Sequence, residues 1–265
     1  MVETTYEAQV RQIAAFDDLL DYFQAQKPRW DGDVASAQAA YAALSSNLKN
    51  VVKNEMNFSV EIDPDAANPS EITGGVFNYI GDAIDAAPRG ALVTLNLLAG
   101  KEHTVDRGIS LLGRQLYFKQ KGVGDRPVLK IGAISDENFN HMRGFDTLGS
   151  ESLTFHNIDI QFPEKNDPAL PWSSLRSLVR YTSVGTRIVS LTSCDITGID
   201  NQSIASSVGA GISIVSLNNT VMDGAIYAVS SMSSGVALIS KLSLTLQNGA
   251  GLNEGGTLGT NYLMN

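Results

Sequence analysis

A segment that recurs about every 24–26 residues restricts the fold of this chain more than any other feature. Residues 185–198 (GTRIVSLTSCDITG) and 211–224 (GISIVSLNNTVMDG) align at an offset of 26 without a gap. Residues 235–249 align with the second copy at an offset of 24 and, after one inserted residue at Lys241, at 25. An earlier copy begins at Gly149, 36 residues before the first. Such self-similarity predicts a solenoid.

The short apolar runs within each copy indicate strands, since no long helical period occurs after Gly90. One coil of this length cannot bury its own apolar strand, whereas coils stacked about 4.8 Å apart bury their strands in ladders. The sequence therefore predicts a mainly β protein, with a parallel β-helix from about residue 91 to 250. One inward ladder is expected to contain Leu191, Leu217 and Leu242.

A loop interrupts the earliest copy and accounts for its longer spacing. The extra residues fall at Pro163–Ser174, a stretch with three prolines. Loops on a rigid scaffold often carry recognition. We therefore expect this loop to be exposed and Trp172 to contact either a glycan or a neighbouring subunit.

The N-terminal region, residues 1–57, has a helical pattern. Apolar residues from Val10 to Phe23 recur at three-and-four spacing, and Pro28 with residues 30–33 is expected to end that helix. A second helix is predicted from about Val34 to Lys53. Its a and d heptad positions are apolar: Val34, Ala37, Tyr41, Leu44, Leu48 and Val51.

This heptad seam has two interpretations. It can face the axis of a parallel homotrimer, or the second helix can pack within its own subunit, including as a hairpin with the first helix. The following residues, 58–75, contain Pro64, Pro69 and two glycines and are predicted to be a linker. Residues 76–265 then form the β-helix domain, whose N-terminal cap is a short helix at 76–87. The C-terminal cap is expected from residues 252–265 or from another subunit.

Composition excludes several classes of protein. The net charge of −9 and the absence of a Lys/Arg cluster argue against nucleic-acid binding. A single cysteine, Cys194, rules out an intrachain disulfide and a cysteine zinc site. The polar, acidic start is unlike a signal peptide, and no apolar run is long enough for a membrane span. We expect no cofactor and no metal, and synthesis in a reducing cytoplasm.

Two carboxylates occupy equivalent positions in the repeat. Asp159 and Asp195 would lie about 5 Å apart on adjacent coils, a separation compatible with a retaining glycosidase. Against catalysis, the next coil has Val221 at this position, and solvated strand residues explain both aspartates. We therefore predict no enzymatic activity and keep both residues as candidate glycan or subunit contacts.

Residues 73–122, beginning TGGVFNYIGDAIDAAPRGALVTLNLLAG, resemble the opening coils of pectin-lyase-like β-helices. In that family a helix with an Ala-Ile-Asp-Ala-Ala phrase, here Ala83–Ala87, precedes a strand that ends in an Ala-Gly turn, here Ala99-Gly100. With a helical segment in front, the chain resembles bacteriophage tail fibres and tailspikes. The resemblance implies a right-handed β-helix, a parallel homotrimer, attachment to other virion proteins through the N-terminal segment, and recognition of bacterial surface polysaccharide.

The predicted function is thus that of a tail-fibre or spike subunit in the virion, made in the host bacterial cytoplasm. Two alternatives stay open from the sequence. The first is a capsid-decoration or head-spike protein with the same fold, and the second is a polysaccharide depolymerase. The chain has fewer coils than the polysaccharide-cleaving tailspikes that it resembles.

Overall fold

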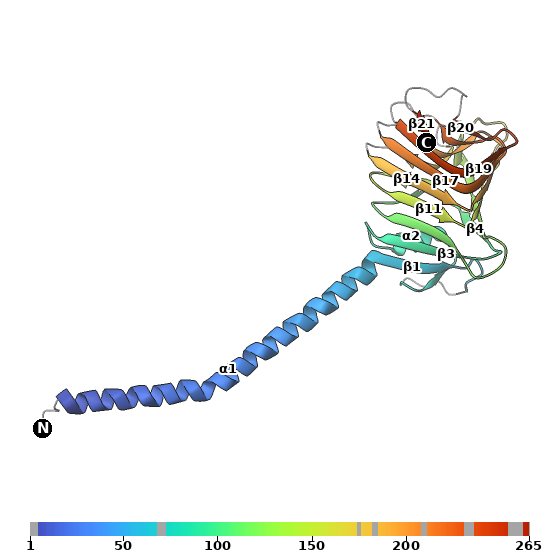
Figure 1. Ribbon diagram of the computed structural model, residues 1–265. Helices are drawn as coiled ribbons and strands as arrows, with labels where there is room; N and C mark the ends of the chain where they lie inside the picture. Colours follow the sequence, from blue (N-terminus) through green and yellow to red (C-terminus); the bar gives the residue numbers. More distant parts are fainter. Residues whose placement is uncertain are drawn as a thin grey trace. The chain divides into compact units, whose positions relative to one another are not determined.

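The computed structural model describes residues 5–67, 73–173, 176–181, 185–207, 211–230, 236–253 and 262–264. The chain divides into two units, Met1–Lys53 and Asn54–Asn265. The first unit is helical, and the second is built from strands that form a large, curled, parallel sheet (Figure 1). The prediction of a mainly β chain with an N-terminal helix is therefore confirmed.

The N-terminal helix, α1 (Thr5–Met56), is one continuous element with Pro28 inside it. The predicted break near Pro28 is wrong, and with it the hairpin of two helices. Proline removes one backbone hydrogen bond and clashes with the preceding turn, which bends a helix without necessarily ending it. Helix-forming sequence on both sides lets α1 continue. Lys27 and Asp31 flank the proline and form an exposed ion pair of 2.6 Å.

The larger sheet of the β domain contains most of the strands, and the named pairs within it are parallel. One arm consists of β1 (Asn57–Ile62), β2 (Val76–Phe77), β3 (Leu92–Leu98), β6 (Gln115–Lys121), β11 (Ser152–His156) and β14 (Thr186–Thr192). The other arm consists of β4 (Glu102–Val105), β7 (Val128–Ile131), β12 (Asp159–Gln161) and β15 (Asp195–Thr197). The long strands β17 (Ile212–Asp223) and β19 (Val236–Gln247) belong to both arms, and β21 (Tyr262–Met264) pairs with β19.

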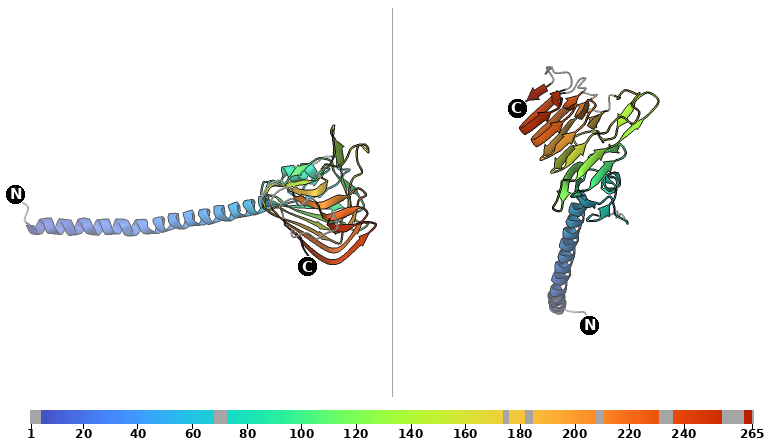
Figure 2. Two further views of the ribbon diagram at one scale, coloured as in Figure 1. Left: turned by 90° about the horizontal axis from the view of Figure 1, so that it is seen from above. Right: turned by 90° about the vertical axis from the view of Figure 1, so that its right-hand side faces the viewer.

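A second sheet completes each repeat. Its six strands are β5 (Ile109–Ser110), β10 (Phe145–Thr147), β13 (Ser177–Tyr181), β16 (Gln202–Ser207), β18 (Ile226–Ser230) and β20 (Gly251–Asn253). Its named pairs are also parallel. The chain visits the first arm, the second arm and this sheet in turn, which gives the stacked, curled arrangement of Figure 2. Apolar side chains from both sheets fill one continuous core.

Two elements at the start of the β domain differ from their predicted bounds. Strand β1 lies inside the predicted linker 58–75, because Phe58, Val60 and Ile62 alternate into the core and pair with β3. Residues 68–72 of that linker lie outside the described part. The predicted cap helix at 76–87 is shorter: β2 comes first, and α2 covers Ile80–Ala86. Buried Arg114 donates two hydrogen bonds to the carbonyl of Ala87 just after α2.

The register confirms most of the predicted ladder and corrects its last member. Leu191 pairs with Leu217, and both are fully buried. Lys241 pairs with Leu217, whereas Leu242 pairs with Asn218 and is 66% exposed. The predicted inward position of Leu242 is therefore wrong. Strands β17 and β19 keep one offset of 24 from Ile212 to Asp223, so no residue is inserted at Lys241.

The bend between the two arms depends on residues with left-handed backbone. Asn157, Ser193, Asn219 and Ser243 occupy successive corners with φ between 49° and 58°. Asparagine tolerates this conformation better than most non-glycine residues. The side chains also connect neighbouring corners, since Asn219 Nδ2 donates to Ser193 Oγ at 3.2 Å. The polar corner residues thus continue as a row along the outside of the domain.

In the described part of the chain, one hairpin is the exception to parallel strand pairing, and the inserted loop packs beside it. Strands β8 (Ala133–Ser135) and β9 (Asn140–Met142) pair antiparallel. The fully buried side chain of Asn140 joins this hairpin to the loop. Its Nδ2 donates to the backbone carbonyls of Asp167 and Leu170, and its Oδ1 accepts from the backbone N–H of Asp167. These hydrogen bonds join the hairpin and the inserted loop into one structure on the side of the domain.

Candidate functional site

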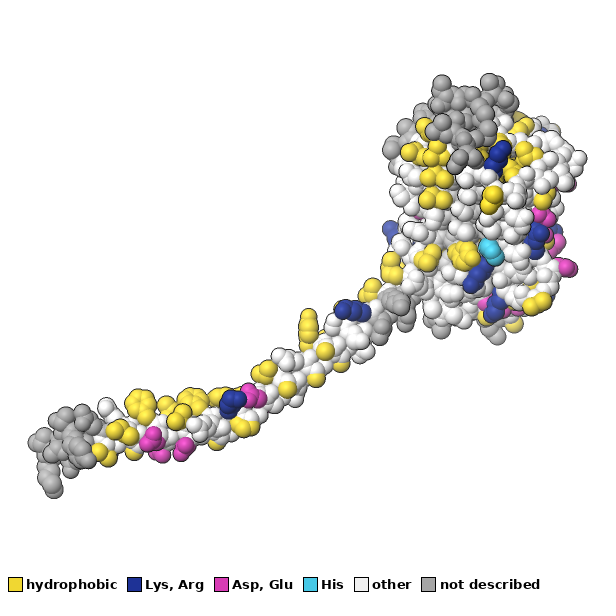
Figure 3. All heavy atoms as spheres, viewed as in Figure 1, with side chains coloured by type: hydrophobic (Ala, Val, Ile, Leu, Met, Phe, Trp, Pro, Cys, Tyr) yellow, Lys and Arg dark blue, Asp and Glu magenta, His cyan; other side chains and the backbone are white. Residues whose placement is uncertain are grey.

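The exposed a/d seam of α1 is the first candidate site. The six predicted trimer contacts all lie on this helix and are all exposed; Tyr41 reaches 75% and Leu44 67%. Because α1 is continuous, the same heptad extends back through Pro28 to Ile13. The seam then comprises Ile13, Phe16, Leu20, Phe23, Lys27, Trp30, Val34, Ala37, Tyr41, Leu44, Leu48 and Val51. Figure 3 shows apolar side chains along the helix.

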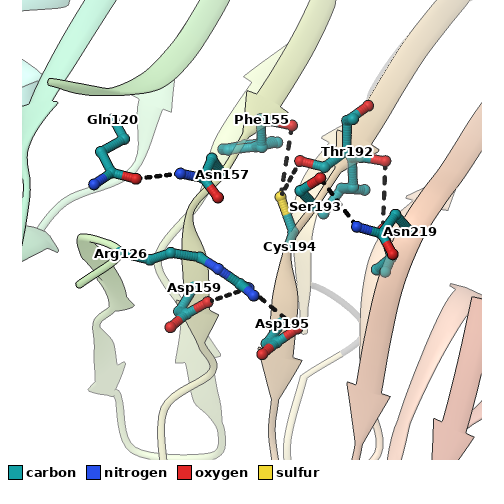
Figure 4. A network of polar contacts seen from close by, with 12 residues as sticks. Gln120, Arg126, Phe155, Asn157, Asp159, Thr192, Ser193, Cys194, Asp195 and Asn219 are labelled. Atoms are coloured by element: carbon teal, nitrogen blue, oxygen red, sulfur yellow. Dashed lines mark hydrogen bonds and ion pairs between the residues drawn. The ribbon is translucent and has the colours of Figure 1, made fainter. Parts of the chain in front are cut away.

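The second candidate site is a polar groove on the β domain, where the structure brings Asp159 and Asp195 together. Asp159 begins β12 and Asp195 begins β15, and these strands are neighbours. Arg126, in the turn before β7, reaches both carboxylates (Figure 4). Its Nη1 lies 2.8 Å from Asp159 Oδ1 and 3.2 Å from Asp195 Oδ1.

The surroundings of Arg126 favour its charged form. Partial burial alone would lower the pKa of Arg126, but the hydrogen bonds and charges of Asp195 and Asp159 outweigh that effect and raise it. Both carboxylates contact the same guanidinium, so the three side chains hold one another in place at the surface. The cluster thus presents carboxylate oxygens at fixed positions, where a polar ligand can bind.

The groove around the cluster has a volume of about 600 Å³ and is lined by Gln120, Gly124, Asp125, Arg126, Val128, Asn157, Asp159 and Asp195. A second hollow of about 480 Å³ shares Gln120 and extends toward Ser59, Asn96 and Lys119. Asn157 Nδ2 donates to Gln120 Oε1, which fixes both amides at the boundary (Figure 4). Carboxylate, amide and guanidinium groups offer acceptors and donors at fixed positions, as a ligand rich in hydroxyl groups requires.

Trp172 does not belong to this groove. Its side chain is 8% exposed and packs in the core, and its indole Nε1 donates to Asp200 Oδ2 at 2.7 Å. Little of Trp172 is therefore accessible for the expected contact with a glycan or a neighbouring subunit. The loop before it alternates between exposed and half-buried residues. Ser174, the last residue of the predicted loop, lies outside the described part. Tryptophan often turns inward when its N–H finds a partner, which local sequence does not reveal.

Sequence reasoning missed Arg126, Gln120 and Asn157. Arg126 lies in a Gly- and Pro-flanked turn far from both aspartates in sequence, and only the stacking of coils brings it to them. Asn157 offered a weak signal, because asparagine at a predicted corner often adopts left-handed backbone. Among the described residues, no three His, Cys, Asp or Glu side chains are grouped to hold a metal ion. No described helix is both long and apolar enough to cross a membrane.

Cys194 lies behind the groove, on the inner face. It is fully buried, and its thiol contacts the carbonyls of Thr192 and Phe155 at 3.4 and 3.5 Å (Figure 4). Thr220 takes the equivalent place in the next coil and is also buried, as the repeat predicted.

The thiol of Cys194 is expected to be inert in the folded protein. Burial raises its pKa to about 11, so that little thiolate forms at pH 8. Titration with an aromatic disulfide reagent at pH 8 should detect no thiol in the native protein and one per chain in denaturant. Rapid native labelling would contradict the buried position.

Comparison of the chain with protein-family models, with curated proteins and with solved structures gave no match.

Proposed function

We propose that this chain is a structural fibre or spike subunit of a bacteriophage virion, that it assembles as a parallel homotrimer through α1, and that its curled parallel sheets form a right-handed β-helix. The observation that carries this proposal is the seam of α1. Apolar side chains occupy eleven of its twelve a and d positions from Ile13 to Val51, and among the described residues the large ones in these positions are all exposed.

A single copy of α1 leaves this apolar seam exposed to water. A helix outside a protein core gains little stability from propensity alone, and it needs packing on an apolar face. Exposed apolar stripes of this length mark interaction surfaces. A seam with a strict seven-residue period is specific for other helices with the same period. A second and third copy of α1 supply that partner in register.

The residues of the seam favour a core wider than that of a two-stranded coil. Phe16, Phe23 and Trp30 occupy successive d positions, and Tyr41 an a position. Large rings need more space than the β-branched and leucine side chains typical of dimers. Lys27, the one charged a residue, would fix the register, because shifted pairings place it against apolar neighbours. These features support a parallel trimer.

The combination of a long helix with the β domain supports the proposed role in a virion. At about 1.5 Å per residue, the 52 residues of α1 extend about 78 Å, as a stalk requires. In the proposal, the N-terminal segment attaches to other virion proteins, and the β domain is carried outward. A capsid-decoration or head-spike protein would have the same architecture. Labelling the subunit on intact virions distinguishes the tail from the capsid.

The assembly is tested by the mass of the intact protein in solution. Sedimentation equilibrium should give three times the chain mass of 28.3 kDa. A stable monomer would contradict the proposal, and a dimer would contradict the argument from the aromatic seam.

The polar groove supports a second element of the function, adhesion to bacterial surface glycan. Its paired carboxylates, held by Arg126, and its amides from Gln120 and Asn157 match the hydroxyl groups of a sugar. Screening on a bacterial glycan array should identify a ligand, which is then measured by calorimetry. Product release from that glycan would instead indicate a depolymerase.

Removal of either carboxylate is expected to weaken glycan binding about tenfold or more, since a lost hydrogen bond to a charged group costs about 1.5–3 kcal/mol. Asp159→Ala and Asp195→Ala are the test variants. Glu102→Ala is the control, because Glu102 is also an exposed carboxylate paired with a cation, Lys130 at 2.8 Å, but lies outside the groove. Equal affinity of all three variants would exclude the groove as the binding site.

A further inference from the structure

The outer face of β14, β17 and the first half of β19 carries an apolar patch. Burial alternates along β14: Arg187, Val189 and Leu191 point into the core, and the residues between them point outward. The register then defines the outward columns. Ile188, Ile214 and Leu238 form one, and Ile212 with Val236 continues the column beside it. These five residues are called here the outer patch.

The outer patch is accessible to a partner. Ile188 is 41% exposed and Ile212 42%, and the other three members are half-buried. Apolar side chains gather on this side of the β domain in Figure 3. The next outward columns hold Ser190, Ser216 and Ser240, and then Thr192, Asn218 and the exposed Leu242. The outer patch is therefore bordered by a column of serines on the same sheet face.

The columns that form and border the outer patch carry no charge, and the exposed Lys241 follows Ser240 at the edge of this face. No outward residue of β14, of the first part of β17 or of Val236–Ser240 is charged. Earlier strands of the same arm differ, since Glu61, Lys119, Lys121 and His156 point outward there. The chain has a net charge of −9, so an uncharged strand face is distinctive. It indicates a contact that does not depend on charge.

The nature of the partner follows from the absence of charge. In a homo-oligomer, residues near the symmetry axis meet their own copies, so that any charge there faces a like charge. A neutral apolar face avoids this repulsion, whereas adhesion to a charged partner would call for complementary charges. Uncharged serine, threonine and isoleucine side chains can pack against the same side chains of an identical face.

We propose that the outer patch is covered by a second copy of this chain, which makes it a contact between β domains in addition to the α1 seam. The inference rests on the proposed homotrimer. It adds that the solenoids themselves associate laterally through β14, β17 and β19. The polar groove on the other arm is not part of this contact.

The contact is tested by cross-linking of the full-length protein through single introduced cysteines. The native thiol, Cys194, is buried, so it does not interfere. Ile214→Cys and Ser216→Cys place a thiol in or beside the outer patch. Thr197→Cys is the matched control, because Thr197 is exposed on β15 of the other arm. Ala37→Cys in the seam and Ser36→Cys beside it report separately on α1.

A short bismaleimide is added to dilute protein, and products are separated in denaturant. We expect Ile214→Cys, Ser216→Cys and Ala37→Cys to form covalent dimers, and Thr197→Cys to stay monomeric. If Ala37→Cys is cross-linked and neither patch variant is, the lateral contact is refuted while the trimer stands. If none is cross-linked, the proposed assembly fails as well. Equal cross-linking of Thr197→Cys would indicate random collision and refute the patch.

Discussion

Replacement of Leu44 by aspartate is expected to convert the assembled protein into monomers. Leu44 is a d residue near the middle of the second half of the seam, and it is 67% exposed in the single chain. Burial of one leucine contributes about 2 kcal/mol, so loss of three in a trimer removes about 6 kcal/mol. Three carboxylates would also face one another at the axis, which adds repulsion and desolvation.

The consequence is a fall in association of about 10⁴-fold or more. Sedimentation at micromolar concentration should show the chain mass for Leu44→Asp and three times that mass for the wild type. Ser36→Asp and Ser46→Asp are the controls, because they add the same charge at c and f positions outside the seam. If Leu44→Asp stays trimeric, α1 does not hold the assembly together. Dissociation of both controls would point to net charge as the cause.

Replacement of Glu151 by alanine is expected to lower the stability of the β domain by about 3 kcal/mol. Glu151 is 2% exposed and connects two turns. Its Oε1 accepts from the backbone N–H of Gly113 at 3.0 Å and of Leu148 at 3.3 Å, and its Oε2 accepts from that of Gly149 at 2.7 Å. A buried donor left without its acceptor costs about 1–3 kcal/mol, and hydrogen bonds to a charged group are the stronger ones.

For a domain of this size, a loss of about 3 kcal/mol corresponds to a fall of about 6–12 °C in the melting temperature. Calorimetry should be run at equal protein concentrations, since assembly also stabilises the folded chain. Glu151→Gln retains one side-chain acceptor and should have an intermediate effect. Glu102→Ala removes an exposed carboxylate and should change the melting temperature little. An unchanged melting temperature for Glu151→Ala would mean that water replaces the carboxylate.

The wrong position predicted for Leu242 shows the limit of aligning the repeats by sequence alone. The segments SLNNT and KLSLT can be aligned by matching Leu217 with Leu242, which requires one inserted residue. The structure instead pairs Leu217 with Lys241 and keeps the ladder unbroken. A strand has a period of two, so a shift by one residue exchanges the inner and outer faces. Leucines on both faces of β19 made the two registers indistinguishable.

The sequence by itself determined the parallel stacking of repeated strands in the β domain, because stacked parallel strands require the same residue types at the same place in each repeat. It predicted a mainly β chain, the pairing of Leu191 with Leu217 and the equivalence of Asp159 with Asp195. It also identified the apolar heptad of α1. These features depend on periodicity, which the linear chain displays directly.

Only the tertiary structure decided which distant residues meet. Arg126 joins Asp159 and Asp195 because its turn stacks beside their coils, and Trp172 is buried because Asp200 lies within reach of its indole. The continuity of α1 through Pro28 likewise unites two short apolar patterns into one seam. The first two outcomes depend on contacts between segments that are distant in the sequence. The third depends on whether the helix on both sides outweighs the break that proline favours. Neither effect produces a periodic pattern in the sequence.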